Sequence, residues 1–113
     1  MIQALLKALP LLRPEYAAKL VGVNGFTGRG SIGYSPSKNG ARKLSVQLHG
    51  LAGREAELII DNASTATIAI KKGHAGAIFA SDNGDKLPDV IEGAQIEVRQ
   101  NGDIVLSGVL ARN

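Results

Sequence analysis

Apolar and polar residues alternate along much of this chain, and the alternation is most regular between Gly93 and Leu110. An Asn101-Gly102 dipeptide interrupts it near the middle, and this pair is typical of tight turns between two strands. Successive side chains of a strand point to opposite faces of its sheet. The stretch 93–110 therefore predicts a β-hairpin.

The length of the turn decides which residues of this hairpin face each other. A two-residue loop at Asn101-Gly102 mixes charged and apolar side chains on one face, which disfavours it. A three-residue loop over 100–102, with Gly102 left-handed in a bulge, separates the two kinds of side chain, so we predict the longer loop. The predicted pairs are Val98 with Ile104, Ile96 with Leu106 and Arg99 with Asp103, and the more polar face carries Gln95, Glu97, Val105 and Ser107.

Six earlier stretches also have the composition of strands and are separated by turns rich in glycine and asparagine. The first is ambiguous, because Pro14 and Glu15 also suit the start of a helix. The predicted strands are 17–23, 30–35, 44–49, 55–61, 65–71 and 76–81, with a turn at 62–64. Short strands and frequent glycine turns favour an all-β, antiparallel fold.

The N-terminal residues 1–12 form the exception to this pattern. Ile2, Leu5, Leu6 and Leu9 recur at helical spacing until Pro10 ends the pattern, which predicts a short apolar helix. A helix this short is unstable alone in water and must lie on another apolar surface. It could form a lid over the β core or a contact between subunits. A membrane anchor is disfavoured because the segment has no basic face.

Two parts of the chain, 30–71 and 76–110, resemble each other at a spacing of about 40 residues, which predicts an internal duplication. Chance similarity between two turn-rich β segments is the alternative. Two four-strand units would pack as a β-sandwich or close into a partly open barrel. We expect the sandwich.

Length and composition limit the possibilities further. A chain of 113 residues is expected to form a single β domain over 1–113. It has no cysteine, which excludes disulfides, thiolate metal sites and cysteine nucleophiles. The absence of cysteine, of a transmembrane-length apolar run and of a secretory signal favours a soluble, cytoplasmic protein.

The net charge of +3 is mild, and the basic residues are spread along the chain. Nucleic-acid binding needs a positive stripe with aromatic platforms for the bases. Only Tyr34, near Arg29, Lys38, Arg42 and Lys43, approaches this arrangement, so no nucleic-acid partner is expected.

The segment 28–33, Gly-Arg-Gly-Ser-Ile-Gly, has the letters of a dinucleotide-binding fingerprint. That site needs a helix directly after the glycines to direct its amides at a pyrophosphate. Pro36 follows too closely to allow such a helix. The glycines are better explained by bends or bulges in a strand.

The turn at 82–85, Asp-Asn-Gly-Asp, offers oxygen ligands of the kind that calcium binds. Asp82, Asp85 and Asp89 are the candidate metal ligands, with Glu92 nearby. The spacing is not that of an EF-hand, and Asp and Asn are common in turns because they bond the local backbone. Both explanations remain open.

His49 and His74 are the only histidines, and they could form a transition-metal site or an acid-base pair. His49 is predicted on the polar face of its strand and His74 in a loop, both solvated. No serine lies in a nucleophile-elbow sequence. No residue therefore supports catalysis specifically, and we expect neither an enzyme nor a cofactor.

These observations predict a non-catalytic module for binding or assembly, and a homo-oligomer would cover its apolar surfaces. One alternative is a protein that binds a sugar, an anion or calcium, through the 82–89 loop or an Arg29/Lys43 cluster. The other is a small hydrolase in which His49 or His74 meets a carboxylate in a cleft.

Overall fold

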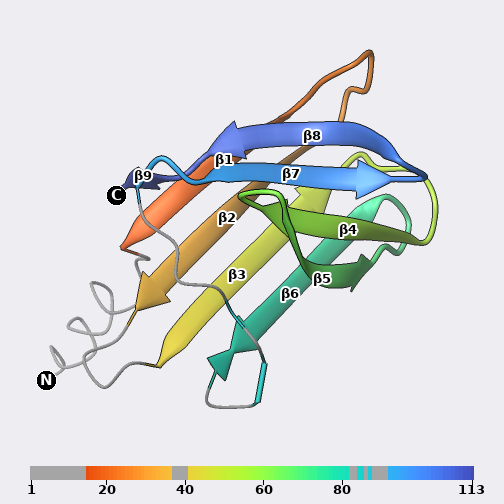
Figure 1. Cartoon of the computed structure of the whole chain (residues 1–113). Helices are drawn as coiled ribbons and strands as arrows, with labels where there is room; N and C mark the ends of the chain where they lie inside the picture. The colour runs from red at the N-terminus through yellow and green to blue at the C-terminus, as the bar shows by residue number, and fades with distance from the viewer. Residues whose placement is uncertain (1–14, 37–40, 82–83, 86, 88–91) are drawn as a thin grey trace, which may run out of the picture.

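The computed structural model describes residues 15–36, 41–81, 84–85, 87 and 92–113 and shows an antiparallel all-β protein (Figure 1). This confirms the predicted fold class. The predicted helix over 1–12 lies outside the described residues. The strands are β1 (Tyr16–Gly22), β2 (Arg29–Pro36), β3 (Arg42–His49), β4 (Glu55–Ile60), β5 (Ala63–Ala69), β6 (His74–Ala80), β7 (Gln95–Gln100), β8 (Asp103–Val109) and β9 (Ala111–Arg112).

All nine strands belong to one sheet, in the order β5-β4-β7-β8-β1-β2-β3-β6, with β9 pairing with the start of β1. The sheet curls over itself so that β4, β5, β7 and β8 lie across β1, β2, β3 and β6 (Figure 1). The expected sandwich is therefore wrong, and the alternative of a partly open barrel is right. The reason is that β8 pairs with β1 at Val21 and Gly22, which joins the two halves edge to edge.

The barrel opens between β5 and β6, which stand at the two ends of the strand order. A two-residue turn with positive φ at Lys72 and Gly73 connects them, and Lys71 and His74 form a single bridge beside it. Beyond that bridge the chain separates, and the Ile70 amide donates instead to the Arg54 carbonyl. The barrel therefore remains incomplete along this edge.

The core lies inside the curled sheet and is built by the inward side of each alternating strand. Tyr34 and Leu44 are neighbours in the β2–β3 register, and both are buried. The largest side chains that are fully buried are aliphatic: Leu20, Ile32, Leu44, Leu48, Leu58, Ile60, Ile96, Leu106, Leu110, Val46, Val98 and Val105. Burial of this apolar surface is the main stabilising contribution to the fold.

The β7–β8 hairpin has a two-residue turn, so the predicted three-residue loop is wrong. Asn101 and Gly102 both have positive φ, and the flanking Gln100 faces Asp103. A bulge in β8 then adds one residue, Val105, which is buried rather than on a polar face. Beyond the bulge, Val98 faces Leu106 and Glu97 faces Ser107, so apolar and charged side chains are separated there, whereas next to the turn Arg99 faces Ile104.

The β4–β5 hairpin is constructed in the same way. Its turn is Asp61-Asn62, with positive φ at both residues, rather than the predicted 62–64. A bulge follows on β5, where Leu58 faces Ala66 and Ile59 faces Ser64. The similar hairpins agree with a duplication, which stays a prediction because 30–71 contains four strands (β2 to β5) and 76–110 contains three (β6 to β8) among the described residues.

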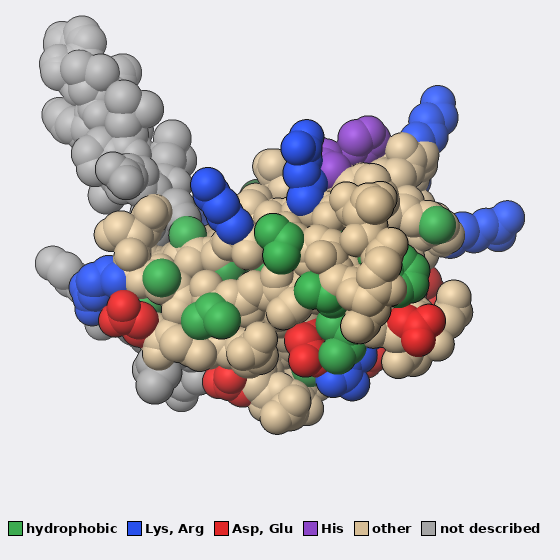
Figure 2. All heavy atoms as spheres, turned by 90° about the horizontal axis from the view of Figure 1, so that it is seen from above, with side chains coloured by type: hydrophobic (Ala, Val, Ile, Leu, Met, Phe, Trp, Pro, Cys, Tyr) green, Lys and Arg blue, Asp and Glu red, His purple; other side chains and the backbone are tan. Residues whose placement is uncertain are grey.

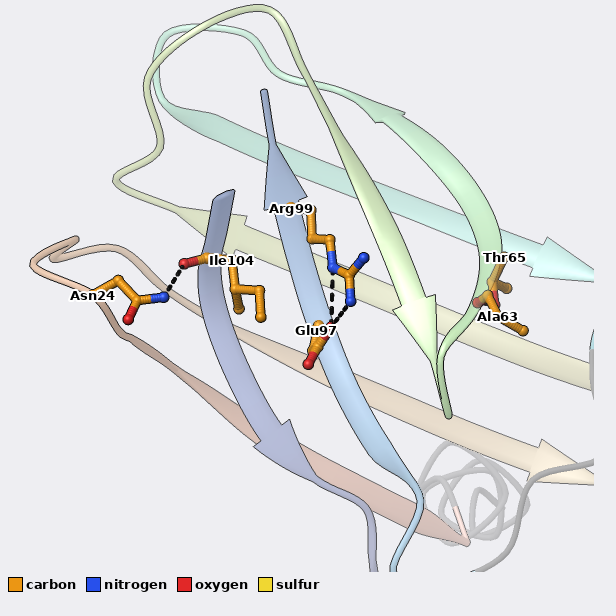
Figure 3. A network of polar contacts seen from close by, with 6 residues as sticks. All are labelled: Asn24, Ala63, Thr65, Glu97, Arg99 and Ile104. Atoms are coloured by element: carbon orange, nitrogen blue, oxygen red, sulfur yellow. Dashed lines mark hydrogen bonds and ion pairs between the residues drawn. The ribbon is translucent and has the colours of Figure 1, made fainter. Parts of the chain in front are cut away.

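A side-chain hydrogen bond fastens the turn between β1 and β2 to the bulged strand. The side-chain amide nitrogen of Asn24 donates to the carbonyl oxygen of Ile104 across 3.1 Å (Figure 3).

Across the part of the chain that the structure describes, no helix is long and apolar enough to cross a membrane.

Candidate functional site

The charged residues of the strands are divided between the two halves of the sheet. The strands β1, β2, β3 and β6 carry four basic residues and no Asp or Glu in their described ranges. The strands β4, β5, β7 and β8 carry four acidic residues and one basic residue, Arg99. We call these the basic half (with Lys19, Arg29, Arg42 and Lys43) and the acidic half (with Glu55, Glu57, Glu97 and Asp103).

The outer face of the basic half carries Lys19, Arg29 and Lys43, whereas Arg42 lies on the other side of β3 and donates to the Leu87 carbonyl oxygen. The acidic strand residues lie on the opposite side of the molecule, because the apolar faces of the two halves meet in the core. Figure 2 shows the Asp and Glu side chains toward one margin, with some Lys and Arg side chains among them. The two histidines, with Lys and Arg side chains beside them, project from the opposite margin. The surface is therefore polarised although the net charge is small.

The outer face of the basic half combines small side chains with exposed apolar ones. Ala17, Gly33, Ser45 and Ile78 form one row across four strands. Ile78 is 68% exposed at the end of this row. A depression of about 540 Å³ runs beside it, between the first three residues of the row and Val109.

His49 and His74 lie side by side at one end of this face. They are direct partners in the antiparallel β3–β6 ladder, and Arg29 is the partner of His49 on the other side. Their Nδ1 atoms are 2.9 Å apart, and their ring planes are inclined at 74° with centroids 5.1 Å apart. Both side chains are exposed.

The backbone around the two histidines holds them in this register. The His74 amide donates to the Lys71 carbonyl, and the Lys71 amide donates to the His74 carbonyl. The Leu51 amide donates to the Gly73 carbonyl, which ties the chain after β3 to the turn before β6. His74 therefore begins a strand, and its predicted position in a loop is wrong.

The short contact between the rings constrains their protons. A hydrogen bond between two Nδ1 atoms needs a proton on one of them and a lone pair on the other. A nitrogen with a lone pair is also a ligand for transition metals. The described residues contain no group of three or more His, Cys, Asp or Glu side chains that could hold a metal ion, so the pair offers two ligands.

On the acidic half, Arg99 is held by a neighbouring carboxylate. Its Nε and Nη2 atoms both donate to Oε1 of Glu97, at 3.0 and 2.5 Å (Figure 3). Glu57 faces Arg99 across the β4–β7 ladder and accepts a hydrogen bond from the Ser64 hydroxyl at 2.5 Å. Glu55 and Asp103 are exposed and line one depression of about 470 Å³.

No protein-family model matches this chain, and no curated protein resembles it significantly. The functional argument therefore depends on the geometry of the chain itself.

Of the three candidate calcium ligands, only Asp85 lies within the described residues. Its Oδ2 atom accepts a hydrogen bond from the Ala80 amide at 2.8 Å, so the carboxylate caps the end of β6. Asp82 and Asp89 lie outside the described residues. The calcium site stays a prediction, and Asp85 bonds the local backbone as turn aspartates commonly do.

The Arg29/Lys43 cluster considered for anion binding does not form. Arg29 faces His49 at one end of the β2–β3 ladder, whereas Lys43 faces Ser35 near the other end. Tyr34 is buried and presents no ring to a base. The fingerprint glycine Gly30 lies in β2, where an added Cβ atom would be 2.6 Å from the Gln47 carbonyl oxygen, so close strand packing explains it.

The sequence did not reveal that the two histidines meet. They are 25 positions apart, and the β4–β5 hairpin lies between them. Their pairing depends on β6 returning to β3, and the local alternation of either strand does not specify its partner. The one signal in the sequence was the Lys72-Gly73 dipeptide, which is typical of a tight turn and would have placed His74 at the start of a strand.

Proposed function

We propose that this protein is a non-catalytic module that self-associates, with the basic half of one copy packing on the acidic half of another. The observation that carries the proposal is the division of charge: four basic strand residues on one half and four acidic ones on the other. A chain without cysteine suits a reducing compartment, so we place this assembly in the cytoplasm.

Charge complementarity favours a second copy as the partner because each copy carries both surfaces. Opposite potentials steer two molecules together and set the orientation in which they meet. The contact would be heterologous, because different faces of the two copies meet, and such contacts build rings or open chains.

The apolar part of such an interface is available on the same face. Ile78 and Val21 are 68% and 58% exposed on β6 and β1, within the basic half. Interfaces gain stability from apolar side chains at their centre and use charges at the rim for orientation. The small residues of the central row, such as Ser45, allow a partner to approach the sheet closely.

Sedimentation velocity at two salt concentrations tests this proposal. At about 20 mM salt and about 100 µM protein we expect oligomers, and at about 0.5 M salt we expect the mass to fall because the surface charges are screened. A single monomeric species under both conditions would contradict self-association.

Two variants distinguish the effect of a charge on the basic half from the effect of the protein's net charge. Lys19→Glu reverses one charge of the basic half and should weaken association. Arg54→Glu changes the net charge equally, but Arg54 lines the same depression as Glu55 and Asp103 on the acidic side. It should leave association unchanged or strengthen it. Equal weakening by both variants would contradict the assignment of faces.

A further inference from the structure

The pair of His49 and His74 has the geometry of a two-ligand metal site. Their Nδ1 atoms are 2.9 Å apart and come from two neighbouring, hydrogen-bonded strands. Two nitrogens that bind one metal at about 2.0–2.1 Å and at a right angle to each other lie about 2.9 Å apart. In a tetrahedral site the separation is larger, about 3.4 Å.

We propose that His49 and His74 bind a divalent transition-metal ion that prefers square-planar or tetragonal coordination, with copper(II) bound most tightly. Imidazole nitrogen suits copper and nickel, and copper(II) has the highest affinity among divalent ions of the first transition row. Water fills the remaining coordination positions, because both side chains are exposed.

The backbone of β3 and β6 holds the two histidines next to each other in the absence of a metal. The β3–β6 ladder sets the Cα positions, and the bond from the Leu51 amide to the Gly73 carbonyl fixes the adjoining turn. Both rings must turn about their Cβ–Cγ bonds to bind a shared ion, because in a hydrogen bond one nitrogen points at the other and not at a third atom. A metal then replaces the proton of the hydrogen bond between the two Nδ1 atoms.

The surrounding charges oppose a cation and limit its affinity. Arg29 is the cross-strand neighbour of His49, and Lys71 bridges to His74. Both basic side chains are exposed, so water and salt screen them, whereas the coordinate bonds to the two imidazoles are short-ranged. We expect Arg29→Gln to strengthen copper binding several-fold by removing one of these charges.

Isothermal titration of the untagged full chain with copper(II) chloride tests the proposal. The two histidines are the only ones in the chain and no cysteine competes, so imidazole binding has a single possible origin. We expect one copper per chain, and an electron paramagnetic resonance spectrum with coupling to two nitrogens. The titration is done at about 0.5 M salt, so that its outcome does not depend on self-association.

Three variants test the geometry. His49→Gln and His74→Gln should each weaken binding by about tenfold or more, because each loses one of two ligands. The double variant His74→Gln/Gly76→His keeps two histidines but places them in different rows of the ladder. An added Cβ at Gly76 meets nothing within 4 Å, so this variant should fold and bind no better than His74→Gln.

Three results would overturn the site. Binding that is unchanged when both histidines are replaced by glutamine would place the copper elsewhere, for example at the terminal amine. Full affinity in His74→Gln/Gly76→His would show that histidine number matters and adjacency does not. Tighter binding of zinc(II) than of copper(II) would contradict tetragonal coordination.

Discussion

Gly108 of β8 packs directly on the backbone of Lys19 in β1. A Cβ atom added at Gly108 would lie 2.4 Å from the Lys19 carbonyl oxygen and 2.8 Å from a methyl carbon of Leu20. This contact lies where β8 reaches β1, which is the junction that joins the two halves into one sheet. A side chain at this position would separate the two strands.

We therefore expect Gly108→Ala to lower the free energy of unfolding by about 1–3 kcal/mol, because the backbone must shift to accept the methyl group. Urea unfolding followed by circular dichroism measures the change. Gly76→Ala is the matched control in β6, where an added Cβ meets nothing within 4 Å, and it should be neutral or slightly stabilising. Equal losses in both variants would show that the close approach at Gly108 is not the cause.

The turn of the β7–β8 hairpin gives a second prediction. Gly102 has a φ of 83°, in the left-handed region that β-branched residues avoid. Gly102→Val should destabilise the protein by about 1–2 kcal/mol, and Gly102→Asn by clearly less, because asparagine tolerates this conformation. Thermal unfolding compares the two variants. Similar melting temperatures for valine and asparagine would argue against the two-residue turn.

One pair of truncations distinguishes a residue that stabilises the fold from a residue that stabilises self-association. Leu48 is fully buried, so Leu48→Ala should lower the unfolding free energy by about 2–5 kcal/mol. Ile78→Ala removes an exposed side chain and should leave stability nearly unchanged, yet weaken self-association by about tenfold. Denaturant unfolding and sedimentation of the same samples give both quantities. A loss of stability in Ile78→Ala without a change in association would remove Ile78 from the interface.

Asp85 tests the difference between a turn cap and a calcium ligand. We expect Asp85→Ala to lose about 1 kcal/mol of stability, because the Ala80 amide loses its acceptor, and Asp85→Asn to lose less because it keeps an oxygen. Added millimolar calcium should not change the melting temperature of either the parent chain or Asp85→Asn. A rise in the parent chain that Asp85→Asn abolishes would establish the calcium site instead.

Strand positions were predictable because local alternation determines them. The alternation of Leu44, Val46 and Leu48 identified β3, and these three side chains are indeed buried in the core. The same reasoning misjudged the β7–β8 turn, because the bulge at Val105 depends on packing that the hairpin's own sequence does not specify. A bulge and a longer loop both place Val98 on the apolar face and Glu97 on the polar face, and alternation cannot distinguish them.

The architecture and the site needed information that no single segment contains. Whether two groups of strands face each other or join edge to edge depends on contacts such as that between Gly108 and Lys19, which are distant in sequence. The pairing of His49 with His74 has the same origin, since it follows from the position of β6 beside β3. The division of charge likewise becomes visible only when the strand order is known.

Complementary charge-swapped variants test the central claim of this account, that opposite halves of the sheet bind each other. Lys19→Glu/Arg29→Glu leaves two basic and two acidic strand residues on the basic half and so removes its positive charge. Glu55→Lys/Asp103→Lys leaves three basic and two acidic strand residues on the acidic half and so makes it weakly basic. By sedimentation velocity at low salt, each variant alone should associate more weakly than the parent chain. An equimolar mixture should form heterodimers, in which the unaltered basic half of one variant packs on the unaltered acidic half of the other. A mixture that stays monomeric, or single variants that associate like the parent, would contradict the account.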